Sequence, residues 1–372
     1  MEKKIRVALI FGGRSGEHEV SLVSAQGIMG AIDKDKYEVL PIGITKEGRW
    51  IAFGDPLKAL QSGMAEGESG PAALLGDPSQ RGLLRLEERG QGIQAVRLTG
   101  VDVVFPILHG TYGEDGTVQG LLELADLPYV GAGVTGSALG MDKILQKTVL
   151  RAHGIPVADF VYFLRKEWEQ DPDRVIQRIL ETVGCPCFVK PANLGSSVGI
   201  SKAHTPEELP GALNEAARYD RKLLVEEAID AREIEVSVLG NDDPIASVPG
   251  EIVPCNEFYD YEAKYIVDDS ELLIPAPISD ELTRCFQEIA IRAYKAVDCA
   301  GMARVDFFLE RGTDRIYYSE LNTIPGFTPI SMYPKLWEAS GISYAELIDR
   351  LIALALERHE DKSRSETSYR PE

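Results

Sequence analysis

The sequence predicts a chain of mixed α/β and α+β class, with a parallel sheet first and two smaller α+β units after it. One observation is a β-rich apolar run at 5–11, which ends at two glycines and precedes apolar residues at helical spacing over 20–32. Another is the return of this order of strand, loop and helix at 101–125. Alternation of this kind favours a parallel sheet.

The composition is that of a globular protein with a strong negative charge. The 372 residues are 44% hydrophobic and 26% charged, which excludes disorder throughout. Lys and Arg number 39 against 59 Asp and Glu, so the formal net charge is −20, and such a field repels DNA and acidic membrane surfaces. No apolar run approaches the roughly 20 residues that span a bilayer, and no cleavable leader pattern follows Met1. We expect a cytoplasmic protein with neither a nucleic acid nor a membrane as partner.

The cysteines favour neither a disulfide framework nor a zinc site. They are odd in number and lack CxxC spacing, at positions 185, 187, 255, 285 and 299. We expect reduced thiols.

Residues from about 55 to 100 separate the two strand-and-helix units. They are rich in Gly, Ser, Gln and Glu and have weak periodicity. This pattern predicts an irregular insertion with a hairpin, which carries little chemistry.

Start and stop signals define the helices of the middle unit. One is expected from about Ser137 to Ala152, closed by Gly154 and Pro156, with Lys143, Lys147 and Arg151 on one face. Others are expected to start at Asp171-Pro172, ending at Gly184 before a strand at 187–190, and at Thr205-Pro206.

Periodicity after residue 223 predicts a second α+β unit. We expect strands at 224–226 and 233–239, an irregular stretch at 251–274, a helix at 281–297 and a frayed polar end after about 358.

Residues 302–310 and 316–322 predict a β-hairpin whose pairing can be derived. A loop of five residues places Glu310 opposite Ile316. Counting back from that pair, Asp306 faces Glu320 and Arg304 faces Asn322, and partners share one side of a sheet. Two carboxylates and an amide oxygen suit Mg²⁺. The alternative is a solvated polar face.

The segment 188–200 places a strand ending in Lys190 before a small-residue loop that could wrap a phosphate with backbone N–H groups. No Gly-Lys-Ser/Thr occurs, so a Walker-type site is unsupported, and residues 12–16 lack the dinucleotide fingerprint. The run 195–199 matches G-x-S-x-G, which makes Ser197 a candidate hydrolase nucleophile. Pro191 and five more residues separate the strand from Ser197, and only His204 and His359 follow, so context argues against a hydrolase.

Taken together, these motifs resemble the D-alanine–D-alanine ligases of the ATP-grasp superfamily. The resemblance covers residues 4 to 358. It rests on the ordered segments 12–22, 109–116, 141–143, 190–199, 261–265, 304–306 and 320–326.

The resemblance implies the ATP-grasp fold, in which a Rossmann-like parallel-sheet domain precedes two α+β subdomains that clasp ATP. The expected parts are a substrate-binding domain at 1–132 with the insertion at 55–100, a central subdomain at 133–228, a catalytic subdomain at 229–360 and a flexible tail at 361–372.

It also implies a reaction in which ATP phosphorylates the carboxylate of one D-alanine and the amine of a second attacks the acyl phosphate. Asp306, Glu320 and Asn322 would hold two Mg²⁺ ions, or Mn²⁺, while Arg304 and the Gly326 N–H would form the oxyanion site. The ATP phosphates would be bound in the segments 141–143, 190–199 and 261–265, by Lys143, Lys190, Ser196, Ser197 and Lys264. The adenine would lie against Glu226, Glu227 and Ile229, and Glu233 would bind the ribose. Several relatives have lysine at position 227, where the contact is through the backbone.

For the substrates, the resemblance implies that Glu17 binds the first ammonium group, with Val20 and His109 close by, and that Ser331 and Met332 hold the second carboxylate. A helix-start carboxylate and a structural histidine are the alternatives for Glu17 and His109. Glu17, Ser196 and Tyr265 would form a hydrogen-bonded trio, and 257–271 would be a lid that excludes water. Relatives that make the D-lactate ester lack the pair Lys264 and Tyr265.

Two other functions are considered. One is an ATP-grasp ligase with another acceptor, such as D-lactate or D-serine. The other is a non-catalytic nucleotide-binding regulator, against which the intact charged residues argue. We also expect a homodimer, formed through an exposed face of the first domain.

Overall fold

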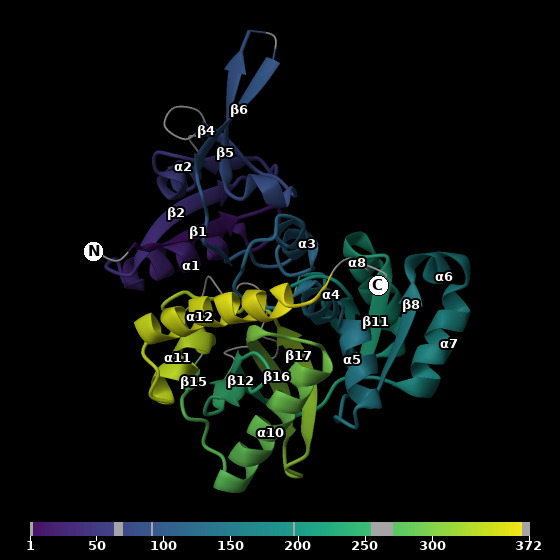
Figure 1. Cartoon of the computed structure of the whole chain (residues 1–372). Coiled ribbons are helices and arrows are strands. Elements are labelled where there is room, and N and C mark those ends of the chain that lie inside the picture. The colour runs from purple at the N-terminus through teal and green to yellow at the C-terminus, as the bar shows by residue number, and fades with distance from the viewer. Residues whose placement is uncertain (1–2, 63–69, 91, 196–197, 254–270, 367–372) are drawn as a thin grey trace, which may run out of the picture.

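Three sheets follow one another along the chain in the computed structural model of Figure 1, which describes residues 3–62, 70–90, 92–195, 198–253 and 271–366. They have seven, four and six strands. The sheets contain strands from residues 5–106, 160–227 and 231–322 respectively, so each lies within one of the expected regions. The predicted class, α/β followed by α+β, is confirmed.

The first sheet has a parallel centre and an antiparallel extension. β1 pairs in parallel with both β2 and β7, as the alternation predicts. The remaining pairs, from β2–β3 to β5–β6, are antiparallel. The elements are β1 Ile5–Gly12, α1 His18–Ala31, β2 Tyr37–Ile44, β3 Trp50–Ala52, α2 Pro56–Ser62, β4 Gly70–Leu74, a 3₁₀ turn Pro78–Gln80, β5 Leu83–Arg89, β6 Gly92–Thr99, β7 Val103–Pro106 and α3 Thr117–Leu124.

The expectation of an irregular insertion at 55–100 is wrong, although its hairpin is confirmed. Ala72, Leu74 and Leu83 are buried in the same core cluster as Ala8 and Ile10 of β1. Short apolar stretches therefore add strands to the sheet, despite their weak periodicity. Figure 1 shows the β5–β6 hairpin projecting away from the rest of the molecule.

The second sheet, in the order β10-β9-β11-β8, is antiparallel. Asp171 caps α7 by accepting the Arg174 N–H, as predicted, and Gly184 follows with φ +76°. The elements are α4 Val134–Met141, α5 Lys143–Ala152, β8 Phe160–Leu164, α6 Arg165–Gln170, α7 Pro172–Thr182, β9 Cys187–Pro191, β10 Ser201–Ala203, a 3₁₀ turn Pro206–Glu208, α8 Leu209–Tyr219 and β11 Lys222–Glu227.

The single helix expected over 137–152 is in fact two, α4 and α5. Asp142 leaves the helical backbone at φ −89° and ψ 100°, and its side chain accepts the N–H groups of Ile144 and Leu145. An N-cap inside the apolar repeat therefore starts a new helix. As a result, Lys143 stands in the first turn of α5.

The third sheet runs in the order β15-β14-β12-β16-β17, and β13 pairs with β12. Its core includes Val236, Val305 and Leu321, with Phe286 of α10 packed against Phe307 of β16. The elements are β12 Ala231–Gly240, β13 Ile245–Ala246, β14 Gly250–Val253, β15 Glu271–Leu273, α10 Asp280–Ala296, β16 Gly301–Glu310, β17 Ile316–Asn322, α11 Met332–Ala339 and α12 Tyr344–Ser363.

The chain end is more ordered than predicted. α12 continues to Ser363, and its last turns contact the first region: Arg358 Nη2 donates to the Tyr129 carbonyl at 3.0 Å, and His359 lies 3.0 Å from Asp126. After residue 358, His359 and Lys362 pair with Asp126 and Glu123 and do not enter a core, so hydrophobic periodicity misses them. Figure 1 shows α12 between the first and third sheets.

Two further observations concern the predictions on cysteines and membranes. Within the described ranges, Cys185, Cys187, Cys285 and Cys299 are free thiols; Cys255 lies outside them. None of the helices in the described part of the chain is both long and apolar enough to cross a membrane.

Because α12 shares a core cluster with β1 and α1, truncating it should destabilise the fold. Leu351 is 0% exposed, so Leu351→Ala should lower the free energy of unfolding by about 2–5 kcal/mol in urea titrations. Leu124→Ala, at a residue 66% exposed on α3, should change it by less than about 0.5 kcal/mol. Equal effects would mean that α12 is not part of the core.

Candidate active site

The β16–β17 hairpin carries four polar residues on one face. Asp306 pairs with Glu320, and Arg304 pairs with Asn322, as the sequence predicts. Their side chains are partly exposed, while the intervening residues of β16 are buried. The hairpin therefore presents two carboxylates, an amide and a guanidinium together.

The predicted pairing fails near the loop, where Leu309, and not Glu310, faces Ile316. A bulge shifts the register after Asp306, so that Ser319 lies opposite no residue of β16 in the ladder. Tyr318 and Leu321 are three residues apart, yet both are buried. In a regular strand they would point to opposite faces, so the bulge allows both to enter the core while Glu320 stays on the polar face.

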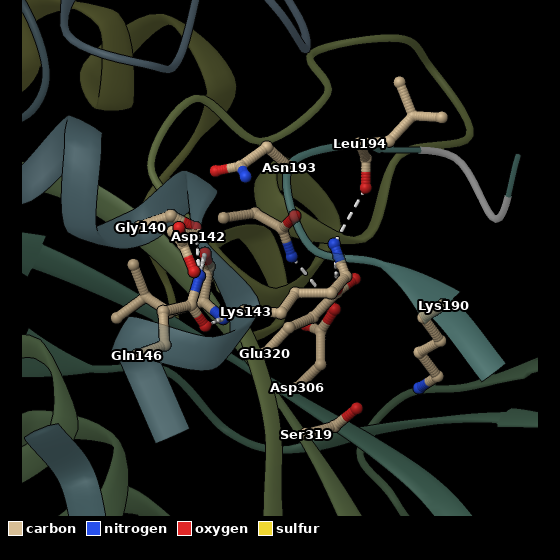
Figure 2. A network of polar contacts seen from close by, with 12 residues as sticks. Gly140, Asp142, Lys143, Gln146, Lys190, Asn193, Leu194, Asp306, Ser319 and Glu320 are labelled. Carbon is tan, nitrogen blue, oxygen red and sulfur yellow. Dashed lines mark hydrogen bonds and ion pairs between the residues drawn. The ribbon is translucent and has the colours of Figure 1, made fainter. Parts of the chain in front are cut away.

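Each carboxylate of this face has a cationic neighbour. Arg304 donates two hydrogen bonds of 2.7 Å to Asp306, and its Nε lies 2.9 Å from Glu235. Burial disfavours the charged guanidinium, but Asp306 and Glu235 outweigh it and raise the pKa of Arg304. Lys143 Nζ lies 3.4 Å from Glu320. Figure 2 shows Lys143, Asp306 and Glu320 in one group.

The donor atoms of this face fit a divalent cation. Carboxylate oxygens of Asp306 and Glu320 and the Asn322 amide are hard ligands, and Asn322 already donates to Asp306 at 3.0 Å. Among the residues described, no three His, Cys, Asp or Glu side chains form a metal-binding group by themselves. Protein ligands this few suit Mg²⁺, which keeps waters and substrate phosphates in its shell.

Lys143 also links α5 to the loop after β9. Its Nζ donates to the Leu194 carbonyl at 2.8 Å, the contact drawn in Figure 2. The loop that was predicted to wrap a phosphate therefore lies beside the hairpin face.

A second set of charges lies where β9, β11 and α5 meet. Glu226 is 1% exposed and forms ion pairs with Lys190 of β9 and with Lys147 of α5, the latter at 3.0 Å. Burial raises the pKa of Glu226, but the two lysines outweigh burial and lower it to about 2. The carboxylate is therefore ionised at neutral pH.

Lys147 is a site residue that the sequence analysis missed. Its position on the Lys143 face was noted, but the 3.6-residue spacing alone does not distinguish a buried lysine from a solvated one. The available signal was a lysine one turn after Lys143, on a helix face that also carries the apolar Ile144 and Leu150.

Three further predicted ATP contacts lie in β11, in β12 or between these two strands. Glu227 accepts the Asp159 N–H at 3.0 Å, Ile229 lies between β11 and β12, and Glu233 lies on β12. All three lie within seven residues after Glu226 in the sequence.

The predicted substrate carboxylate, Glu17, lies between two glycines. A Cβ atom added at either Gly110 or Gly195 would be 2.7 Å from Glu17 Oε2. Three loops therefore meet at this side chain. Gly110 also has φ +74°, a backbone conformation that favours glycine, and a Cβ at Gly195 would require the Glu17 carboxylate to move. Val20 is buried one turn further along α1.

His109 is buried and bound on both ring nitrogens. Nδ1 lies 2.9 Å from the Ile324 carbonyl and Nε2 lies 3.2 Å from Ser24 Oγ. Burial lowers the pKa of His109, but Glu114, 3.6 Å away, more than compensates and raises it. Burial also raises the pKa of Glu114, to about 7.

The loop after β17 brings Gly326 against Ser331. A Cβ atom at Gly326 would lie 2.7 Å from Ser331 Oγ, so a side chain there would displace the Ser331 hydroxyl. Ser331 precedes α11 and does not cap it; its hydroxyl accepts the Thr328 N–H. The Met332 side chain packs with Ile252 and Leu336, which leaves only its backbone for a ligand.

Four predicted site residues, Ser196, Ser197, Lys264 and Tyr265, lie outside the described residues, as does most of the predicted lid at 257–271. The trio of Glu17, Ser196 and Tyr265 and the hydrolase alternative at Ser197 stay predictions.

Comparison with known proteins gives a consistent result over almost the whole chain. The family model of the D-ala D-ala ligase N-terminus matches residues 6–132, and that of the D-ala D-ala ligase C-terminus matches 149–353. A D-alanine–D-alanine ligase of Thermoanaerobacter sp. (strain X514) is 56% identical over 365 residues, 98% of this chain and 99% of the relative. One from Natranaerobius thermophilus is 51% identical over 367 residues, 99% of each chain.

Solved structures agree. The D-alanine-D-alanine ligase of Coxiella burnetii superposes with a TM-score of 0.82 at 41% identity, covering 97% of this chain and 96% of that one. The VanG D-Ala:D-Ser ligase of Enterococcus faecalis gives a TM-score of 0.84 at 36% identity, covering 95% and 100%.

The pair His109 and Glu114 predicts a pH dependence of stability. The fold raises the pKa of both groups, so protonation of these groups stabilises the folded protein. This stabilisation is present at low pH and is lost as the pH rises through the folded pKa values, near 7 for Glu114. Glu114→Gln removes most of this effect. Urea unfolding at pH 5 and pH 8 should show the wild type losing stability relative to the variant. Parallel pH profiles would contradict the assignment.

Proposed function

This chain belongs to the D-alanine–D-alanine ligase family, and from that premise we propose that it joins two D-alanine molecules to D-alanyl-D-alanine, a precursor of peptidoglycan, at the expense of ATP. Members of this family use ATP and a divalent metal ion. The proposed reaction passes through an acyl phosphate of the first D-alanine. The amine of the second attacks its carbonyl carbon, and the tetrahedral intermediate releases phosphate.

The cations of the site suit phosphoryl transfer, which depends on charge neutralisation and positioning more than on covalent help. In the proposal, Lys143 and Lys190 contact the ATP phosphates, with Lys264 and the backbone of Ser196 and Ser197 completing the site. Glu226, Glu227 and Ile229 border the adenine, and Glu233 binds the ribose. Support comes from the loop after β9, because Lys190 lies near the end of β9 and Lys143 donates to the Leu194 carbonyl of that loop.

Asp306, Glu320 and Asn322 are the proposed holders of two Mg²⁺ ions, for which Mn²⁺ could substitute. When bound, the ions would neutralise the charge of the phosphates. The observation that carries the proposal is the hairpin face itself: the bulge at Ser319 keeps Glu320 beside Asp306, opposite Lys143.

The substrate side is proposed from the close approach of loops. Glu17 binds the ammonium group of the first D-alanine, with Val20 and His109 behind it. Arg304 and the Gly326 N–H stabilise the tetrahedral oxyanion. The second carboxylate is held by Ser331 and the Met332 backbone at the start of α11, where N–H groups and the helix dipole favour an anion.

D-Alanine is the favoured second substrate. The relatives that share 51% and 56% of the sequence are named as D-alanine–D-alanine ligases, whereas the relative named for D-serine shares 36%. A cytoplasmic location, where ATP is available, and a homodimer are further parts of the proposal.

The proposal is tested by assaying phosphate release with ATP and Mg²⁺ and identifying products by mass. We expect release with D-alanine and formation of its dipeptide, and none with L-alanine or without amino acid. A product only from D-alanine with D-lactate or D-serine would move the specificity. ATP binding without turnover across the panel would favour a regulator.

Removal of a metal-binding oxygen should stop turnover without unfolding the protein. Asp306→Asn and Glu320→Gln should each lower kcat at least about 100-fold, with a much smaller effect on the melting temperature, because the amides keep the shape of the side chains and an oxygen that accepts hydrogen bonds. Glu310→Gln, on the same hairpin away from the site, is the control. A wild-type rate in either site variant would contradict the metal assignment.

A further inference from the structure

Lys147 is among the least exposed charged residues of the described chain, and the proposed reaction leaves it without a role. It lies on α5 and is 1% exposed. Its Nζ donates to the Ser319 carbonyl at 3.1 Å and lies 3.0 Å from Glu226 Oε2. A buried lysine is costly unless it is paired, so these partners call for an explanation.

The two lysines on Glu226 differ in how firmly they are held. The Lys147 side chain is 2% exposed, that of Glu226 is 1% exposed and that of Lys190 is 12% exposed. Lys147 has a second anchor in the Ser319 carbonyl, and the Tyr318 ring centroid lies 5.9 Å away. Lys190 stands at the end of β9, before the loop beside Lys143. Lys190 is therefore the cation that can change partner.

The difference between the two lysines matters because the buried Glu226 carboxylate needs a counter-ion at all times. A lysine that turns from Glu226 to a phosphate leaves a carboxylate with almost no access to water. Removing one partner of a buried ion pair is strongly unfavourable, because the other charge stays desolvated and uncompensated. With a second cation already on the other oxygen, the carboxylate keeps a counter-ion throughout.

We propose that Lys147 is a positioning residue that serves as the resident counter-ion of Glu226, so that Lys190 is free to leave Glu226 and contact the triphosphate. Lys147 itself does not touch the nucleotide. This inference rests on the proposed function, because it requires Lys190 to bind phosphate.

The bulge of β17 holds Lys147 in place. Ser319 is the residue displaced from the ladder, and its carbonyl accepts from Lys147. The preceding α5 residue, Gln146, accepts the Leu321 N–H at 3.2 Å and donates to the Leu321 carbonyl at 3.3 Å. Side chains of α5 thus bind the backbone on both sides of Glu320, and the same helix serves both the counter-ion and the hairpin face.

The test is a double-mutant cycle on the full chain that compares the KM for ATP in four proteins: wild type, Lys147→Met, Glu226→Gln and the double variant. Lys147→Met should raise the KM for ATP at least about tenfold, with the KM for D-alanine within about threefold. In the Glu226→Gln background the same change should have an effect below about threefold, because no carboxylate remains to withhold Lys190.

Lys166→Met on α6 removes an exposed lysine and is the matched control, which should leave all constants unchanged. If Lys147→Met alone melts too low to assay, ATP-induced shifts in melting temperature of the double variant and Glu226→Gln still test the second arm of the cycle. Equal effects of Lys147→Met in both backgrounds, or an effect on melting temperature alone, would overturn the inference. Absence of ligase activity in the wild type would instead overturn the proposed function.

Discussion

Glu226, Asp306 and Glu320 lie where the second and third sheets meet, and each is paired with a lysine or arginine. Glu226 forms ion pairs with Lys147 and Lys190, Asp306 with Arg304, and Glu320 with Lys143. Low-exposure carboxylates need such partners, since desolvation otherwise favours their neutral form. Lys147 of α5 contacts Glu226 of the second sheet and the Ser319 carbonyl of the third, and Lys143 of the same helix contacts Glu320. Through these two lysines, α5 links the second and third sheets before any ligand arrives.

The same pairing accounts for how a site rich in fixed charge can bind a highly charged substrate. Arg304 and Lys190 occupy carboxylates in the ligand-free chain, so binding would exchange partners instead of creating new charges in a buried place. Such exchange is favourable only where a carboxylate losing its cation has another at hand. For Glu226, Lys147 is the cation that stays. For Asp306, a divalent ion bound to the hairpin face would replace Arg304 as the counter-ion.

Part of this arrangement could be predicted from the sequence, because periodicity and capping signals are local, and Asp171 marked its helix start. The predicted pairing of Asp306 with Glu320 is correct, but the count began from a loop pair that is wrong by one residue, and the bulge after Asp306 offsets that error. The exceptions were a local N-cap at Asp142, which the apolar repeat concealed, and features that depended on tertiary contacts. Asp142 ended α4 within an uninterrupted apolar repeat, the Ser319 bulge was set by burial of both Tyr318 and Leu321, and the end of α12 was ordered by polar contacts with the first region. Lys147 was missed because only the fold shows that it is buried beside Glu226.

The account depends on Lys190 changing partner while Lys147 does not, and a crystal structure with a non-hydrolysable ATP analogue and Mg²⁺ tests this directly. We predict that Lys190 Nζ contacts a phosphate oxygen and no longer lies within 4 Å of Glu226, the limit for an ion pair, whereas Lys147 still contacts Glu226 and the Ser319 carbonyl. A structure in which Lys190 stays on Glu226, or in which Lys147 turns to the nucleotide, would contradict the account.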